Sequence, residues 1–298
     1  MATITIMKLK NAKQISKSRE LGVLLNSTLT QRRILYSCLA VMNPVVPHLA
    51  GMKYAELKEW MLDNAREAHK LRTYYLDIRD FSGVWGLSKS KDVKGMLLDA
   101  IGYDEASGTS KIMHLCFKYK ALNTNNLEFI NVFSRVKIEP ETASLMIRFT
   151  DDILPYLINL ASYTAIPFKA TVGFKCNYSF AMLEYLLQRY VRGSDYPTHT
   201  LSLEALQMTL GTNKQKSYER WHNFQTRVLE PIAQDFSNIA GGGYELTFTP
   251  IYAKGTMRGR RKVESVEIAF SNIGVQKFLT EKEAQITNHN KKRKEVVA

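Results

Sequence analysis

The stretch that decides the fold runs from Leu201 to Phe236 and has the sequence LSLEALQMTLGTNKQKSYERWHNFQTRVLEPIAQDF. Ser202 is a favoured helix N-cap, the leucines within residues 203–210 recur at helical spacing, and Gly211 ends that pattern. A polar turn follows, and apolar spacing then predicts a longer helix over residues 217–237. Two helices joined by a short turn are typical of a helix-turn-helix.

Two strands are predicted downstream of this helix-turn-helix. After the break at Gly241-Gly242-Gly243, apolar residues alternate with polar ones over residues 244–248 and again over residues 266–270. A helix-turn-helix followed by a β-hairpin predicts a winged helix. The loop from Ala253 to Lys262 is then the wing.

The first half of the chain repeats this order of elements. A helix is predicted over residues 28–42 and a short strand at residues 74–76. Two short helices follow within residues 78–101, and strand-like segments separated by turn residues occupy residues 112–149. The sequence therefore predicts an α+β fold of two tandem winged-helix domains.

The limits of these domains are predicted from changes in pattern. Residues 28–150 are predicted to form the N-terminal winged helix and residues 151–280 the C-terminal one. Residues 1–27 are basic without periodicity, which predicts a loosely held arm. Residues 281–298 are basic and polar, which predicts a flexible tail.

Composition excludes several classes of protein. The 298 residues are 45% hydrophobic and 23% charged, which is typical of a globular protein with a core. No stretch approaches the roughly 18–20 apolar residues of a membrane span, and the N-terminus lacks the apolar segment of a secretory signal. Cys38, Cys116 and Cys176 show no metal or disulfide spacing and are expected to be reduced thiols in the core of a cytoplasmic protein.

The net charge of +13 favours a polyanionic partner, although a basic protein with a solvated surface has the same total. On the helix predicted over residues 217–237, the basic residues and an asparagine lie opposite the apolar face. Arginine can pair with guanine and asparagine with adenine in the major groove, so this outer face is a candidate base reader. The alternative is a solvated charged face, which more often contains acids than this one, where only Glu219 lies nearby.

The predicted wing has the sequence AKGTMRGRRK and contains five cations without an acid. Gly255 and Gly259 allow the backbone to approach a phosphate closely, and such a loop repels itself unless an anion binds. The alternative is a solubilising surface loop. The candidate DNA-binding residues of this half are Lys214, Lys216, Ser217, Arg220, Asn223, Arg227, Lys254, Arg258, Arg260, Arg261 and Lys262.

The first half contains weaker candidates for DNA contact, which fit an ordinary basic surface equally well. They are Lys89, Lys91, Lys94 and Lys118. Pro231 lies inside the longer predicted helix and predicts a kink, so base contacts are expected N-terminal to it.

The sequence offers no constellation for catalysis. It has no GxxxxGK[ST] phosphate loop, and its six histidines never occur as His-x-His or HExxH. We therefore expect no enzymatic activity, no metal and no cofactor.

Several blocks of this sequence, in order, resemble one protein family. They are TLTQRRILYSCLAVM, CNYSFAMLEYLLQRYV, LSLEALQMTLG, SYERWHNFQTRVLEPIAQDF and FTPIYAKGTMRGRRKVESVEIAF. Together they span about residues 29–270 and are similar to the replication initiators of iteron-bearing plasmids, the Rep initiator family with its RepE- and RepA-type proteins. The charged stretch of residues 52–72 does not fit the family pattern, which leaves the dimer interface open.

The resemblance implies a tandem winged-helix protein that binds direct repeats (iterons) at a plasmid origin. Its C-terminal domain would then be the main DNA reader, and its N-terminal domain would contact DNA or dimerise. It further implies opening of an A·T-rich segment, recruitment of host helicase and other replication proteins, and autorepression as a dimer at an inverted repeat. The alternative is a dedicated winged-helix transcriptional repressor. A DNA-processing enzyme is disfavoured because the motifs of relaxases and recombinases are missing.

Overall fold

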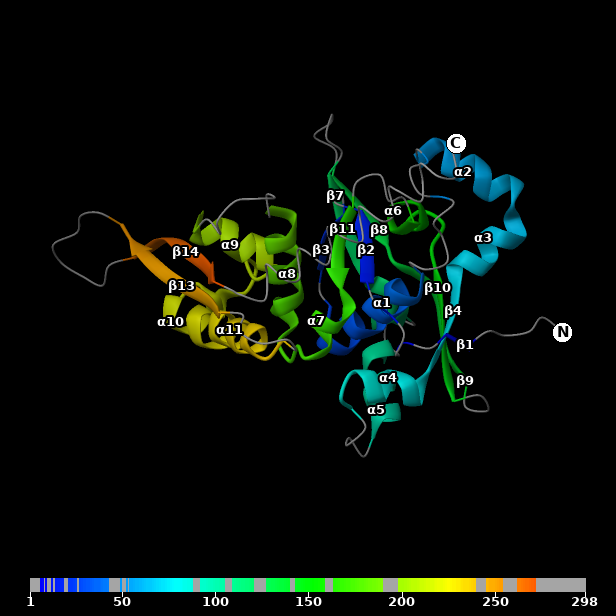
Figure 1. Ribbon diagram of the computed structural model, residues 1–298, viewed down its shortest axis with the longest axis horizontal. Coiled ribbons are helices and arrows are strands. Elements are labelled where there is room, and N and C mark those ends of the chain that lie inside the picture. Colours follow the sequence, from blue (N-terminus) through cyan, green and yellow to red (C-terminus); the bar gives the residue numbers. More distant parts are fainter. Residues whose placement is uncertain are drawn as a thin grey trace. The chain divides into compact units, whose positions relative to one another are not determined.

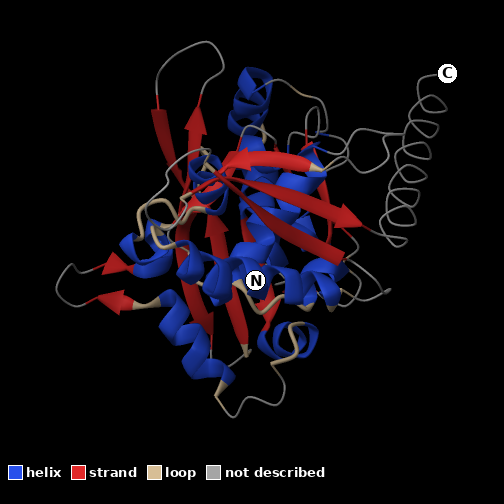
Figure 2. Cartoon of the chain, turned by 90° about the vertical axis from the view of Figure 1, so that its left-hand side faces the viewer, coloured by secondary structure: helices blue, strands red, loops and turns tan. Residues whose placement is uncertain are grey.

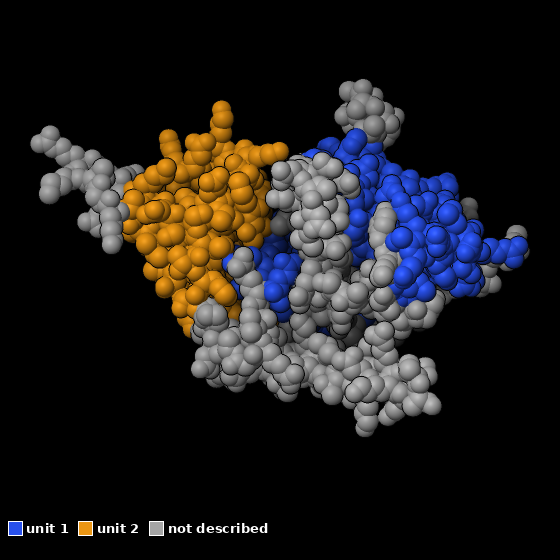
Figure 3. All heavy atoms as spheres, turned by 90° about the horizontal axis from the view of Figure 1, so that it is seen from above, with its two compact units in different colours: residues 1–189 blue, residues 190–298 orange. Residues whose placement is uncertain are grey.

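The structure is a computed structural model, in which helices and strands are intermixed (Figure 2). The chain divides into two compact units, Met1–Arg189 and Tyr190–Ala298 (Figure 3). The structure describes residues 6–7, 9, 12, 14–18, 21–25, 27–42, 49, 52, 54–87, 92–104, 109–120, 127–139, 143–158, 163–189, 198–239, 245–253 and 262–271.

Helix α1, Leu29–Met42, is the central helix of the first unit. Its side chains from Gln31 to Met42 are buried all round, so its polar residues need partners within the protein. Gln31 donates from Nε2 to the carbonyl of Ala100 at 2.7 Å, and Arg32 donates from Nε to Ser27 Oγ at 2.8 Å. The predicted helix over residues 28–42 is confirmed.

A four-stranded sheet in the order β1-β4-β10-β9 carries the helix-turn-helix of the first unit (Figure 1). Strand β10 pairs antiparallel with both β4 and β9, and β1 pairs parallel with β4. The bounds of these strands are Ile6–Met7 for β1, Thr73–Asp77 for β4, Phe133–Glu139 for β9 and Ser144–Phe149 for β10.

The helix-turn-helix of this unit consists of α4, Ile78–Val84, and α5, Val93–Ile101. Aspartates cap both helices: Asp77 Oδ1 accepts from the backbone of α4 at 2.7 and 2.9 Å, and Asp92 Oδ1 accepts from Gly95 N at 2.6 Å. Trp85, just after α4, is buried and donates from Nε1 to Ser37 Oγ of α1 at 2.9 Å. The two short helices predicted within residues 78–101 are thus confirmed.

The structure differs from the predicted N-terminal arm. Strand β2, Gln14–Ser18, pairs antiparallel with β11, Tyr163–Pro167, and strand β3, Leu21–Leu25, pairs antiparallel with β7, Cys116–Lys120. Strand β8, Leu127–Asn131, completes the sheet β3-β7-β8. Three short strands therefore lie in the segment predicted as an arm, and strands far along the chain hold them in place.

The remaining elements of the first unit complete its core. The later helices are α6, Leu154–Ile158, α7, Phe168–Val172, and α8, Asn177–Arg189. Helix α8 packs on α1, with the rings of Tyr36 and Phe180 edge to face at 4.8 Å. A small insertion after α5 contains β5, Tyr103–Asp104, β6, Thr109–Ser110, and a 3₁₀ helix, Lys111–His114.

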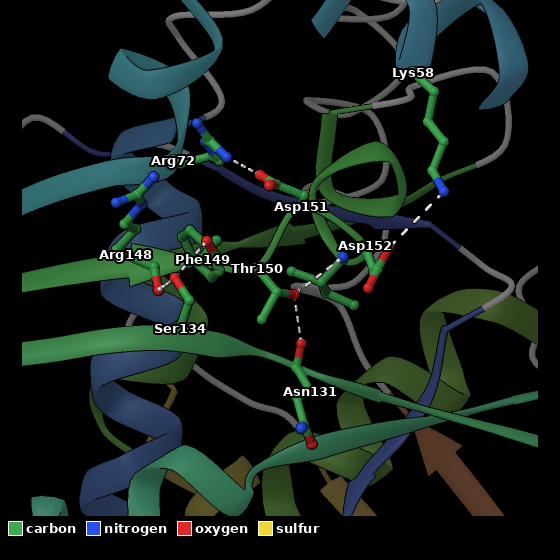
Figure 4. A network of polar contacts seen from close by, with 10 residues as sticks. Lys58, Arg72, Asn131, Ser134, Arg148, Phe149, Thr150, Asp151 and Asp152 are labelled. Atoms are coloured by element: carbon green, nitrogen blue, oxygen red, sulfur yellow. Dashed lines mark hydrogen bonds and ion pairs between the residues drawn. The ribbon is translucent and has the colours of Figure 1, made fainter. Parts of the chain in front are cut away.

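The charged stretch of residues 52–72 forms two helices, α2, Tyr54–Asp63, and α3, Ala65–Arg72. Two ion pairs fasten them to the turn after β10 (Figure 4): Arg72 pairs with Asp151, and Lys58 Nζ lies 3.8 Å from Asp152 Oδ1. Thr150 stabilises the same turn because its Oγ1 donates to the Asn131 carbonyl at 2.7 Å.

The second unit contains the antiparallel sheet β12-β14-β13, in which β12 is His199–Ser202, β13 Glu245–Tyr252 and β14 Val263–Ser271. Helix α9, Leu203–Leu210, directly follows β12. A 3₁₀ turn, Lys216–Tyr218, precedes α10, Trp221–Phe224, which continues through a π turn, Gln225–Leu229, into α11, Glu230–Ser237.

The two units share one strand topology. In each, the strand before the helix-turn-helix (β4 or β12) pairs with the last hairpin strand (β10 or β14), which pairs with the first (β9 or β13). The same arrangement therefore occurs twice. The division falls after Arg189 rather than at the predicted limit of residue 150, because α6, α7 and α8 pack within the first unit.

Two expectations from composition can be compared with the structure. The three cysteines are free, but only Cys38 is buried, where burial raises the pKa of its thiol; Cys116 and Cys176 are half-buried. Among the described residues, no helix is both long and apolar enough to cross a membrane.

Candidate nucleic-acid interface

The turn of the second helix-turn-helix forms as its sequence predicts. Ser202 caps α9 by accepting from Ala205 N at 3.1 Å. Gly211 ends α9 with φ of 72°, in the left-handed region that glycine adopts without steric cost. The chain then turns back at the buried Thr212, whose N–H donates to the Gln207 carbonyl at 2.8 Å.

The helix predicted over residues 217–237 begins later than expected. Arg220 has extended backbone angles, φ −82° and ψ 117°, and the helix starts at Trp221. In a helix that began at Ser217, the carbonyls of Ser217 and Tyr218 would be among the first to accept backbone hydrogen bonds. Side-chain amides occupy them instead: Gln207 Nε2 donates to Tyr218 O, and Asn223 Nδ2 to Ser217 O, both at 2.9 Å. The predicted start of this helix at residue 217 is therefore wrong.

The buried side of this segment follows helical spacings of three and four residues and also includes Leu229 and Asp235. Phe224, Val228, Ile232 and Phe236 are all fully buried, and the Phe236 ring packs edge to face on Phe270 of β14 at 6.0 Å. The kink expected from Pro231 takes the form of the π turn that immediately precedes it. Trp221 and Gln225 are half-buried.

The exposed side of the segment is cationic. Its predicted contact residues Lys214, Lys216, Ser217, Arg220 and Arg227 all have exposed side chains. Asn223 is half-buried and holds the preceding 3₁₀ turn through its bond to the Ser217 carbonyl, so reading a base with Nδ2 would compete with that bond. Glu219 is the one acid within residues 213–227. This surface can bind phosphate and offer arginines to base edges.

The wing extends from the hairpin of β13 and β14. Its base is closed by a bond from Ala253 N to the Lys262 carbonyl at 3.0 Å, and the Lys262 side chain is exposed. Ile251 and Tyr252 beside it are also exposed. The predicted contacts Lys254, Arg258, Arg260 and Arg261 lie outside the described residues.

The candidates of the first unit lie on different elements where the structure describes them. Lys94 is exposed on α5, whereas Lys89 and Lys91 lie outside the described residues. Lys118 belongs to β7 of the sheet β3-β7-β8, not to the hairpin β9–β10 that matches the wing hairpin of the second unit. The segment joining β9 to β10 has the sequence PETA, without a cation.

Gln207 is a residue that sequence reasoning missed. It ties α9 to the 3₁₀ turn that carries Lys216 and Ser217, and so fixes the spacing of the two helices. As a polar residue in the middle of α9, Gln207 does not take part in the apolar spacing from which the helix is predicted. Only the close approach of the Tyr218 carbonyl in the folded protein reveals its role.

The chain contains two copies of one winged-helix topology. The second copy carries the cationic stretch of residues 214–227, called here the recognition segment, and the helix that starts in it at Trp221 is the recognition helix. These features define a tandem winged-helix DNA-binding protein. The family model described as "Initiator Replication protein, WH1" matches residues 14–187, more than half of the chain and almost all of the first unit. The chain therefore belongs to the initiator replication protein family. This is a DNA-binding, non-catalytic family, as the sequence analysis expected.

Solved structures support the fold. The Pi initiator protein, crystallised in complex with iteron DNA, matches with a TM-score of 0.59 and 15% identity over 86% of this chain and 96% of that chain. This likeness confirms the predicted α+β fold of two winged-helix domains.

Two structures of domains 2 and 3 of RctB also match. One has a TM-score of 0.38 and 14% identity over 72% of this chain and 79% of that chain. The other has a TM-score of 0.39 and 12% identity over 93% of both chains. No curated protein matches the sequence.

Proposed function

We propose that this protein initiates plasmid replication by binding direct repeats, the iterons, at the origin. The observation that carries the proposal is the exposed cationic surface of the second helix-turn-helix, in a chain whose family is that of replication initiators. The likeness to the Pi initiator, which was crystallised with iteron DNA, supports the same kind of target.

The recognition helix and the wing contribute different kinds of DNA contact. Arg220 and Arg227 are exposed at and after the start of the recognition helix, where a winged helix meets the major groove, and each can pair with a guanine. Lys214 and Lys216 in the preceding turn, together with the cations of the wing, neutralise phosphates. The first part supplies sequence specificity and the second supplies affinity.

The later steps follow from the family resemblance. Bound monomers open an adjacent A·T-rich segment and recruit host helicase and other replication proteins. Dimers repress the initiator's own promoter through an inverted repeat. All of this takes place in the bacterial cytoplasm, where plasmid DNA resides.

Footprinting of the purified protein on the DNA that flanks its own gene tests the proposal. We expect protection of several direct repeats spaced by about one helical turn, beside an A·T-rich tract. Protection of a single palindrome would instead identify a dedicated transcriptional repressor. No protected site at all would refute sequence-specific binding.

Arg227→Ala is expected to lower the affinity for the footprinted repeat by about 1–3 kcal/mol, because a bidentate contact to one base pair is lost. Arg220→Ala is expected to have an effect of the same size. Titrations of the repeat and of a scrambled duplex measure the effect, which should be much smaller on the scrambled sequence.

Arg66→Ala, at an exposed arginine of α3, is the matched control, since it removes the same charge away from the recognition segment. Equal losses in the control and in both test variants would show that net charge, not base contact, determines the affinity.

A further inference from the structure

The π turn in the recognition helix changes the angular positions of the buried residues. Three turns of a regular α-helix contain about 10.8 residues, whereas Phe224 and Phe236 are twelve residues apart, with Val228 and Ile232 evenly between them. In a regular helix this spacing would carry the side chains about 120° around the axis. The π turn at Gln225–Leu229 adds one residue to a turn and reduces this drift to about 20°, so that Phe224 and Phe236 lie almost in line.

Pro231 maintains this turn. Proline lacks the N–H that would donate to the Arg227 carbonyl in an α-helix, and its ring clashes with that carbonyl. Glu230, just before it, donates instead to the Gln225 carbonyl, five residues back. A widened turn therefore satisfies the backbone at the point where the proline prevents α-helical pairing.

The extra residue changes the outer face. Three successive side chains, Gln225, Thr226 and Arg227, lie within the π turn between the buried Phe224 and Val228. Thr226 is tied to the helix because its Oγ1 donates to the His222 carbonyl at 2.8 Å. Because a π turn holds more residues than an α turn, Arg227, the exposed one of the three, points in a different direction from the one it would take in a regular α-helix.

We infer that the π turn determines DNA specificity, with Pro231 as the positioning residue that maintains it. The inference rests on the proposed function, because it concerns the same recognition segment. The π turn decides which base pair Arg227 reaches, while the contacts of Arg220 and of the wing do not depend on it. The turn is therefore part of the code by which this protein distinguishes its repeats from related ones.

The experiment compares base preferences selected from a pool of duplexes with a randomised centre. The variants are a deletion of Thr226, which restores a three-residue spacing between Phe224 and the residue that follows Arg227, and Pro231→Ala, which restores the N–H. Arg227→Ala marks the base pair that Arg227 reads. Gln234→Ala, at an exposed position of α11, is the control that should select the wild-type consensus.

The Thr226 deletion is expected to lose about tenfold or more of the preference at the base pair marked by Arg227→Ala, since that is the size of one good base contact. The remaining consensus positions and the affinity for a scrambled duplex should stay within about twofold of the wild-type values. Pro231→Ala is expected to broaden the preference at the same base pair, with circular dichroism unchanged.

If the deletion variant folds and selects the wild-type consensus with wild-type preference, the inference is overturned and the π turn serves packing alone. If the deletion variant does not fold, Pro231→Ala decides, and an unchanged preference in it overturns the inference equally. If the wild-type protein itself selects no consensus, the proposed function fails, which is a distinct result.

Discussion

Glu184→Leu is expected to destabilise the first unit by about 3–5 kcal/mol, because it breaks a buried polar network by removing one partner. Glu184 of α8 is 8% exposed and accepts a hydrogen bond from the Tyr36 hydroxyl of α1. Arg32, one turn before Tyr36, is 4% exposed. Leucine fills a similar volume but cannot accept from Tyr36, and it leaves the Arg32 charge buried with less compensation.

The pKa shifts agree with this description of the network. Burial lowers the pKa of Arg32, while Tyr36 and Glu184 act in the opposite direction and favour its charged form. Burial, and then the charge of Glu184, raise the pKa of Tyr36 well above its usual value, so its hydroxyl remains a donor at any ordinary pH. Removing Glu184 takes away a group that favours the charged guanidinium.

Chemical unfolding followed by far-UV circular dichroism and tryptophan fluorescence measures the effect on the first unit. Glu59→Leu, at an exposed position of α2, is the matched control and should lie within about 0.5 kcal/mol of the wild-type protein. A Glu184→Leu protein as stable as the wild type would show that the network contributes no net stability.

The second helix-turn-helix could be predicted from sequence because its signals are local. The Ser202 cap, the leucines of α9 and the stop at Gly211 lie within ten residues, and each acts through chemistry that neighbouring residues determine. The strands of the wing hairpin show the alternation of a sheet with one buried face, Leu246 inward on β13 and Val266 and Ile268 inward on β14.

The N-terminal strands could not be predicted in this way. Strand β2 pairs with residues more than a hundred positions away, and its five residues, QISKS, contain one large apolar side chain. Its conformation is decided by the partner strand rather than by its own propensity. The end of the first unit could not be predicted for the same reason. It depends on contacts of α8 with Tyr36, which is distant from α8 in the sequence.

The start of the recognition helix shows where periodicity misleads. The apolar spacing predicts helix from Ser217, but side chains of Gln207 and Asn223 occupy the carbonyls of Tyr218 and Ser217 and delay it to Trp221. A wheel drawn at 100° per residue also fails across the π turn. The residue types of the candidate DNA interface could thus be found from sequence, whereas their angular arrangement depends on these contacts.

Replacing Arg258, Arg260 and Arg261 together with glutamine is expected to weaken binding to every duplex on the order of 10²-fold at 0.15 M salt. Each lost phosphate contact lowers the slope of log affinity against log salt concentration by about 0.9, so three lower it by about 2.7. The effect is independent of sequence, because counterion release depends on phosphate charge and not on base edges. Titrations of the repeat and of a scrambled duplex at several salt concentrations measure both slopes.

The wing variant and Arg227→Ala are expected to differ in their salt dependence and in their specificity. The base-reading variant should lose affinity for the repeat with little change in salt slope, whereas the wing variant should lose slope on both duplexes and keep its specificity ratio. Lys70→Gln, at an exposed lysine of α3, controls for the general loss of positive charge. An unaltered salt slope in the wing variant would exclude the wing from the DNA interface, because a cationic loop that touches phosphates cannot be neutralised without reducing counterion release.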